Sequence, residues 1–174
     1  MNRGIWRLQI IVGSLITALG PASSAGVFKN QFIEFETPER WSCALEGTEY
    51  VCQDTRPEFQ REAIIVLAAK LRGEQDSLTA YRDYLSRPRE FKAPNGKRIT
   101  SRPLKVSSVV INGLTWITSI HEESEIPGFR THYFATVRDP IAVLVTFSIR
   151  TSRYGAVMPK FETMISTLKI KYRK

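Results

Sequence analysis

The two histidines of this chain, His121 and His132, are its best candidates for metal chemistry. Two imidazoles and a carboxylate can bind zinc, and Glu123 lies between the histidines in the sequence. In the strand pairing that we expect, His121 faces Arg130 and His132 faces Ser119, so both histidines lie on one sheet face as diagonal neighbours. Their separation is then at the limit for sharing an ion, and Arg130 would repel it. We therefore predict no metal site, with a small secreted metal-dependent hydrolase that uses these residues as an alternative.

The chain carries no other familiar catalytic pattern. The nucleophile motif GxSxG and the phosphate-binding motifs GxxxxGK[ST] and GxGxxG do not occur in it. The acidic stretch with Glu122, Glu123 and Glu125 lacks the alternating Asp and Asn ligands and the glycine of a calcium loop, so we interpret it as a solvated turn. We predict no catalytic residue and no cofactor, and an enzyme is the less favoured class.

Cys43 and Cys52 are the only cysteines, and their surroundings indicate a β-hairpin with its turn at Glu46-Gly47-Thr48. Pairing about the Gly47–Thr48 bond places the two cysteines opposite each other. Facing residues of an antiparallel pair have Cα atoms ~4.5–5.5 Å apart, which is within reach of a disulfide. In an oxidising compartment this isolated pair predicts one structural disulfide.

Residues 1–25 have the pattern of a secretory signal peptide. Arg3 and Arg7 precede an apolar run over Leu8–Leu19, and Ser23-Ser24-Ala25 provides small residues for a peptidase. The run is about a dozen residues long, whereas a membrane-spanning helix needs ~20. We predict cleavage after Ala25, a periplasmic or secreted protein without a transmembrane segment, and retention as an anchor as the alternative.

The charge of the chain indicates its partners. The full sequence has a net charge of +8, and removal of Arg3 and Arg7 with the leader lowers it to +6. The basic groups are not interleaved with aromatic residues as in a single-stranded nucleic-acid groove, so we expect no nucleic acid and instead an envelope protein or an anionic ligand. The candidate binding residues of the most basic region are Arg89, Lys92, Lys97 and Arg98, and a second basic patch is formed by Lys169, Lys171, Arg173 and Lys174.

Two further features could mediate contacts. Tyr154 follows the last predicted strand together with Arg150 and Arg153, which makes Tyr154 and Arg153 candidates for an exposed binding surface. The polar segment 88–102 reads as the longest loop, and its insertion into a target protein would make this an inhibitor-type protein. Trp41 and Trp116 are interpreted as core residues.

The order of predicted elements favours an α+β fold in a single domain, residues 26–174, which we expect to be a monomer. Hydrophobic alternation predicts an antiparallel meander in which both faces of the strand over 141–150 are apolar and need cover by helices and N-terminal segments. Two-residue turns throughout would put Leu114 and Trp116 on the same face as Tyr133. The predicted strands are 31–36, the cysteine hairpin, 62–71, 104–111, 114–121, 129–138 and 141–150, with a buried helix as the alternative for 62–71. The predicted helices are one that Asp76 or Ser77 caps and that runs through Arg87, and one over 158–167 with Pro159 in its first turn.

This arrangement resembles the PsbP-like superfamily of α/β/α sandwiches over roughly residues 28 to 170. The resemblance implies a non-catalytic domain that binds partners or larger assemblies, and the cysteine hairpin suggests an exported branch. No functional residue is carried over, because no ligand or partner motif is present. The matching segments are Phe35-Glu36-Thr37-Pro38-Glu39-Arg40-Trp41, the Leu78–Leu85 helix, Ile111-Asn112-Gly113-Leu114-Thr115-Trp116, Tyr133-Phe134-Ala135-Thr136 and Phe161–Ile170.

Overall fold

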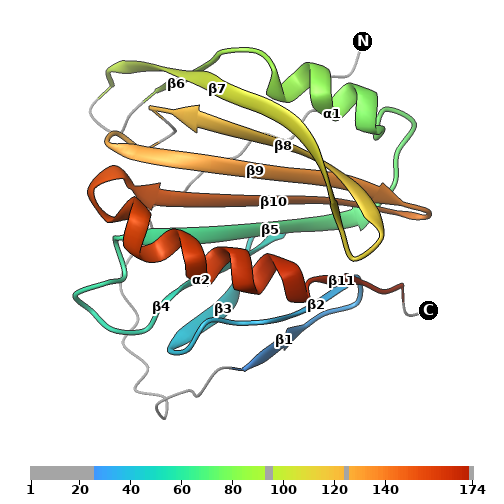
Figure 1. The fold of residues 1–174 in the computed structure, drawn as a ribbon, viewed down its shortest axis with the longest axis horizontal. Coiled ribbons are helices and arrows are strands. Elements are labelled where there is room, and N and C mark those ends of the chain that lie inside the picture. Colours follow the sequence, from blue (N-terminus) through green and yellow to red (C-terminus); the bar gives the residue numbers. More distant parts are fainter. Residues whose placement is uncertain (1–25, 93–95, 124–125, 173–174) are drawn as a thin grey trace.

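The described part of the chain forms two antiparallel sheets and two α-helices (Figure 1). The computed structural model describes residues 26–92, 96–123 and 126–172, so the predicted leader lies outside the described residues. The larger sheet has the strand order β3-β4-β5-β10-β9-β8-β7-β6, and the smaller has the order β1-β2-β11. The elements are β1 (Val27–Lys29), β2 (Ile33–Glu36), β3 (Trp41–Glu46), β4 (Glu49–Asp54), β5 (Ala63–Leu71), α1 (Leu78–Leu85), β6 (Arg89–Lys92), β7 (Arg98–Ile111), β8 (Leu114–Glu122), β9 (Phe129–Arg138), β10 (Ile141–Arg150), α2 (Tyr154–Thr167) and β11 (Lys169–Ile170).

Strand β10 lies at the centre of the larger sheet and is covered on both faces. Its residues Val145 and Phe147 belong to a core cluster that includes Phe161 of α2, and the Phe147 and Phe161 rings stack with centroids 4.0 Å apart. Leu144 points to the opposite face, where it packs against the cluster that contains Tyr81 of α1. The two helices therefore cover opposite faces of the sheet, and the predicted sandwich is confirmed.

Helix α1 follows the predicted sequence signals closely. The Ser77 hydroxyl accepts a hydrogen bond from the Ala80 N–H at 3.1 Å and caps the helix start. Tyr81 and Leu85, one turn apart, are its buried residues. The helix ends at Leu85, two residues earlier than expected and ahead of Pro88, which cannot continue it.

The smaller sheet was only partly expected. Strand β2 was predicted, and its buried residues Ile33 and Phe35 cover the α2 side of the core. Strand β1 and the short C-terminal strand β11 were not predicted. In β11, Lys169 pairs with Glu34 and Ile170 pairs with Ile33, so the end of the chain returns to its beginning.

The cysteine hairpin is confirmed. Strands β3 and β4 pair with Cys43 opposite Cys52, and these two residues form a disulfide with Cα atoms 4.0 Å apart. Gly47, in the turn, has a φ of 63°, a conformation that suits glycine. Strand β4 also pairs with β5, so the disulfide holds together an edge hairpin of the larger sheet.

The prediction of a long polar loop over 88–102 is wrong. Most of this segment forms the strand β6 and the beginning of β7, in which Phe91 pairs with Ile99. Ile99 and Ser101 are buried while Thr100 between them is exposed, and this alternation of a half-buried strand was hidden by the many basic side chains. The described residues of this segment therefore do not form a loop of the expected length.

The predicted pairing of β8 with β9 is also wrong, by one residue. Glu122 faces Arg130 across the pair, with seven residues, 123–129, between them. A shift of one residue turns every side chain of a strand to the other face. Trp116 consequently lies in the α2-side cluster with Leu114 beside it, and not on the face of Tyr133.

Helix α2 begins at Tyr154, four residues before its predicted start. Pro159 therefore lies in the second turn, where its missing N–H leaves the carbonyl of Gly155 without a helical hydrogen bond. The helix buries Phe161, Met164 and Ile165 against the sheet. Both helices of the described part of the chain are too short or too polar to cross a bilayer.

We predict that the disulfide contributes measurably to stability. Replacing both cysteines (Cys43→Ala and Cys52→Ala) should lower the free energy of unfolding by about 2–3 kcal/mol, because the short closed loop restricts the unfolded chain only modestly. Urea denaturation followed by tryptophan fluorescence measures this. Adding dithiothreitol should lower the free energy of unfolding of the wild type to the same extent and leave that of the double variant unchanged. A wild type whose free energy of unfolding does not change with dithiothreitol would contradict the prediction.

Candidate functional site

The structure separates the two histidines. Because of the β8–β9 register, His121 faces Thr131 and His132 faces Ile120, so the expected facing pairs with Arg130 and Ser119 are wrong and the histidines lie on opposite faces of the sheet. Among the described residues no group of three or more His, Cys, Asp and Glu side chains is placed to hold a metal ion.

His121 fixes the end of α1 to the sheet. It is fully buried, and its Nε2 lies 3.0 Å from the carbonyl oxygen of Leu85, the last residue of the helix. A carbonyl only accepts, so Nε2 carries the proton and Nδ1 accepts from the Ser101 hydroxyl at 3.1 Å. The Ser119 hydroxyl donates to the same carbonyl. Burial lowers the pKa of His121, which suits this neutral, structural arrangement.

His132 forms a second buried contact, on the α2 side. Its Nε2 shares a hydrogen bond of 2.8 Å with the hydroxyl of Tyr154. Burial, with a smaller contribution from the charge of Arg130, lowers the pKa of His132 to about 4. Tyr154, a candidate for an exposed contact, is half-buried and occupied by this bond.

Arg153 lies beside Tyr154 in a cluster of three arginines that contact two carboxylates. Arg150 and Arg153 contact the two carboxylate oxygens of Glu62, at 3.1 and 3.6 Å. Arg130 lies over the Tyr154 ring, 4.8 Å from its centroid, and pairs with Glu122 at 3.2 Å. These contacts fasten the start of α2 to the ends of β8 and β10.

The four basic candidates of the 88–102 region lie on or beside the β6–β7 hairpin. Arg89 lies over the Tyr84 ring, 3.2 Å from its centroid, and so contributes to holding α1. Lys92 faces Arg98 across the pair, and Arg98 lies 3.6 Å from the carboxylate of Glu90. Lys97 is exposed at the turn. The structure thus places these residues near one another but without a hollow around them among the pockets that it shows.

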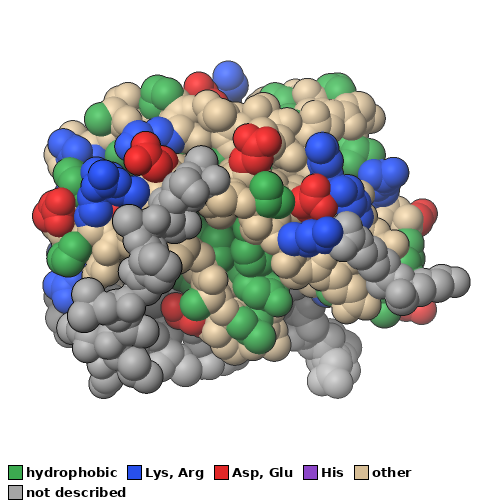
Figure 2. All heavy atoms as spheres, turned by 90° about the horizontal axis from the view of Figure 1, so that it is seen from below, with side chains coloured by type: hydrophobic (Ala, Val, Ile, Leu, Met, Phe, Trp, Pro, Cys, Tyr) green, Lys and Arg blue, Asp and Glu red, His purple; other side chains and the backbone are tan. Residues whose placement is uncertain are grey.

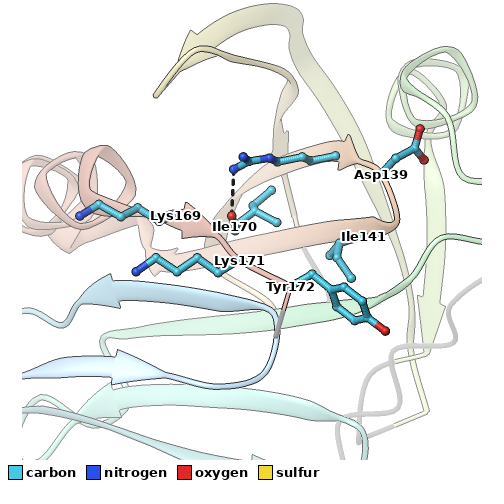
Figure 3. A pocket seen from close by; sticks show the side chains of 7 residues that line it. Asp139, Ile141, Lys169, Ile170, Lys171 and Tyr172 are labelled. Carbon is cyan, nitrogen blue, oxygen red and sulfur yellow. Dashed lines mark hydrogen bonds between the residues drawn. The ribbon is translucent and has the colours of Figure 1, made fainter. Parts of the chain in front are cut away.

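Lys169 and Lys171 of the second basic patch, in contrast, border a hollow, whereas Arg173 and Lys174 lie outside the described residues. Lys and Arg side chains gather toward both ends of the face in Figure 2, with hydrophobic side chains between them. The hollow has a volume of about 520 Å³ and lies where β9 ends, β10 begins and the C-terminal strand β11 passes. It is lined by Arg138, Asp139, Ile141, Lys169, Ile170, Lys171 and Tyr172 (Figure 3). We call it the basic hollow.

Local structure holds these side chains in place. Arg138 donates from Nη1 to the carbonyl oxygen of Ile170 at 2.9 Å, which ties the end of β9 to β11 (Figure 3). The Tyr172 ring stacks nearly parallel on Phe32, with centroids 6.3 Å apart. Lys171 also donates its backbone N–H to the carbonyl of Phe32.

The hollow has a surplus of positive charge. Its one carboxylate, Asp139, is held 2.7 Å from Arg72, and Lys171 pairs with Glu34 at 2.8 Å. Within the described residues, neither Arg138 nor Lys169 has an ion-pair partner, although both are exposed. These two cations are the groups that can meet an incoming anion. The sequence identified the lysines as a basic tail but not Arg138, whose nearness depends on the return of β11.

No protein-family model and no curated protein matches the sequence, but solved structures share its fold. The cyanobacterial PsbP of Synechocystis superposes with a TM-score of 0.61 at 15% identity, over 92% of this chain and 99% of that protein. The Ran-binding protein Mog1p of Saccharomyces cerevisiae gives 0.54 at 10%, over 84% and 96%. A Bacteroides thetaiotaomicron protein gives 0.52 at 12%, over 87% of this chain and 50% of that one. The chain therefore has the PsbP-like fold, as its sequence predicted.

The buried histidines predict a loss of stability in acid. The pKa of His132 is lowered to about 4 in the folded protein, whereas in the unfolded chain it is near 6.5. As the pH falls below about 6.5 the unfolded state binds the proton first, so the free energy of unfolding decreases by on the order of 3 kcal/mol by pH 4. Urea denaturation at about pH 7 and about pH 4.5 measures this decrease. It should be smaller in the His132→Gln variant, and an equal decrease in both proteins would contradict the assignment.

Proposed function

We propose that this protein is an exported, non-catalytic binding or accessory protein of the cell envelope, periplasmic or secreted, that holds an anionic partner in the basic hollow. The observation that carries the proposal is the pair of exposed cations, Arg138 and Lys169, without ion-pair partners among the described residues. Two cations that border one hollow and lack ion-pair partners give it a positive potential, which attracts an anion.

Two features support the location. The Cys43–Cys52 disulfide is typical of proteins from oxidising compartments, and the sequence of residues 1–25 has the pattern of a cleavable leader. We take the mature protein to begin at Gly26 and to act as a monomer.

The fold supports a binding role by analogy. Mog1p is described as a Ran-binding protein, so this arrangement of sheet and helices can present a surface to another protein. Fold alone does not determine function, and the partner of this chain is expected to be recognised by charge. The alternative of a metal-dependent hydrolase has no geometric support, because His121 and His132 lie on opposite faces of the sheet.

Export and processing can be tested together. Expression of the full chain in a Gram-negative host should yield a periplasmic protein whose first residue is Gly26 and whose intact mass lacks two hydrogens, as expected for one disulfide. Mass spectrometry of the periplasmic fraction measures both. A cytoplasmic protein that retains its first 25 residues would contradict the proposed location.

The binding role predicts a charge-dependent interaction. Mature protein immobilised on a resin should capture an envelope component at low salt and release it as salt is raised, because charge contacts between exposed groups are screened. The variant Lys169→Glu should lose this capture. The control Lys160→Glu, which makes the same charge change at an exposed position of α2 near Asp54, should retain it. Equal capture by both variants, or none by the wild type, would refute the proposed role of the hollow.

A further inference from the structure

The composition of the basic hollow points to a ligand class, an inference that rests on the proposed function and makes it more specific. The hollow combines three cations with an apolar and aromatic wall. A site for a bare inorganic ion needs only the cations, and a site for a neutral apolar ligand needs only the wall. Both together indicate a ligand with an anionic group and an organic body.

The cations that border the hollow come from two parts of the chain. Lys169 and Lys171 are two residues apart, and their side chains extend in the same direction in Figure 3. Arg138 approaches from the end of β9 and is oriented by its bond to the carbonyl of Ile170. That bond engages only Nη1 and leaves further guanidinium N–H groups available.

The neighbouring charges leave the hollow positive. Glu34 is the nearest carboxylate on the smaller sheet, and it faces Lys29 on one side and Lys169 on the other in the strand register. It also pairs with Lys171, so one carboxylate lies among three lysines. Asp139, the acidic residue of the lining, is bound by Arg72 at 2.7 Å. The total charge of these groups is positive, which favours the binding of an anion, and specifically one with more than a single charge.

The apolar surface of the hollow comes mainly from Tyr172, which is 39% exposed, because Ile141 and Ile170 are nearly fully buried. The stacking of Tyr172 on Phe32 supports that ring from behind, so a flat or aliphatic group can lie against it without first ordering it. An ordered aromatic surface costs little conformational entropy on binding.

The hollow has room for more than a bare ion. Its volume is about 520 Å³, whereas one water molecule occupies ~30 Å³ in the liquid. We infer that the basic hollow binds a phosphate ester, with the phosphate at Arg138 and Lys169 and the organic part against Tyr172. The phosphate can belong to a lipid headgroup or to a soluble ester.

A phosphate ester satisfies these groups better than a carboxylate does. A phosphate monoester carries a charge of about −1.5 to −2 at pH 7 and three acceptor oxygens, which match two unpaired cations and the partly neutralised Lys171. The guanidinium of Arg138 can present parallel N–H groups to two phosphate oxygens. A monocarboxylate has half the charge and would leave one cation unmatched.

Calorimetric titration of the mature protein with three small probes tests the ligand class. Phenyl phosphate should bind saturably at a single site. Inorganic phosphate should bind more weakly because it lacks the organic part, and benzoate should bind more weakly because it lacks the second charge. If benzoate binds as tightly as phenyl phosphate, or if phenyl phosphate shows no saturable binding and the vesicles described below do not bind either, the inference is wrong.

Matched variants test the site. Arg138→Gln combined with Lys169→Gln should weaken phenyl phosphate binding by about tenfold or more, since a hydrogen bond to a charged group contributes ~1.5–3 kcal/mol. Lys169→Gln alone removes a side chain without a described ion-pair partner, so its effect cannot be attributed to misfolding. The control Lys105→Gln combined with Lys160→Gln removes the same two charges elsewhere and should bind as the wild type does. Equal weakening in the control would show general charge attraction and overturn the site.

Vesicles distinguish the two sources of the phosphate. If the ligand is a lipid headgroup, vesicles of phosphatidic acid, which is a phosphate monoester, should bind the wild type and should bind Tyr172→Ala and Lys169→Gln less well, with no binding to phosphatidylcholine vesicles. If only phenyl phosphate binds, the ligand is a soluble ester. Loss of envelope capture in Lys169→Glu without binding of any phosphate probe would leave the proposed function intact and refute the ligand class. Binding of the phosphate probe without any envelope capture that depends on Lys169 would support the ligand class and refute the proposed function.

Discussion

The burial of both faces of β10 is the constraint on which the rest of the structure depends. This strand has apolar side chains on both faces, with Val143 and Val145 on one face and Leu144 on the other. Such a strand must be covered on two sides. Helix α2 and the smaller sheet cover one side, and α1 covers the other. Buried polar groups hold both helices on the sheet. His121 hydrogen-bonds to the last residue of α1, and His132 hydrogen-bonds to Tyr154, the first residue of α2.

The candidate site follows from the same constraint. To complete the cover over β10, the chain leaves α2 at Leu168 and returns as β11 beside β2, which brings the lysines of the tail next to the β9–β10 turn. There, side chains from distant parts of the sequence border a hollow of about 520 Å³. The arginines at the other end of the sheet contact Glu62, Glu122 and aromatic rings, and these contacts stabilise the fold.

Local signals in the sequence were sufficient for much of the fold. The cysteine hairpin, the Asn112-Gly113 turn and the helix between Ser77 and Pro88 each depend on neighbouring residues and were predicted. The register of β8 with β9 depends on the number of residues between Glu122 and its partner Arg130, and no local pattern reveals whether that number is odd or even. Only half of the site could be predicted, for a similar reason. Lys169 and Lys171 are two residues apart in the sequence, but the contact of Arg138 with Ile170 spans 32 residues.

The central claim is that the basic hollow, and not one of the other basic surfaces, is where this protein meets its anionic partner. Backbone-amide chemical shifts of the ¹⁵N-labelled mature protein, recorded during titration with phenyl phosphate, test this most directly. The account predicts that the largest shifts cluster at residues 138–141 and 168–172 and saturate together. Shifts centred on the β6–β7 hairpin or on Arg153 and Tyr154, with residues 138–141 unmoved, would contradict it.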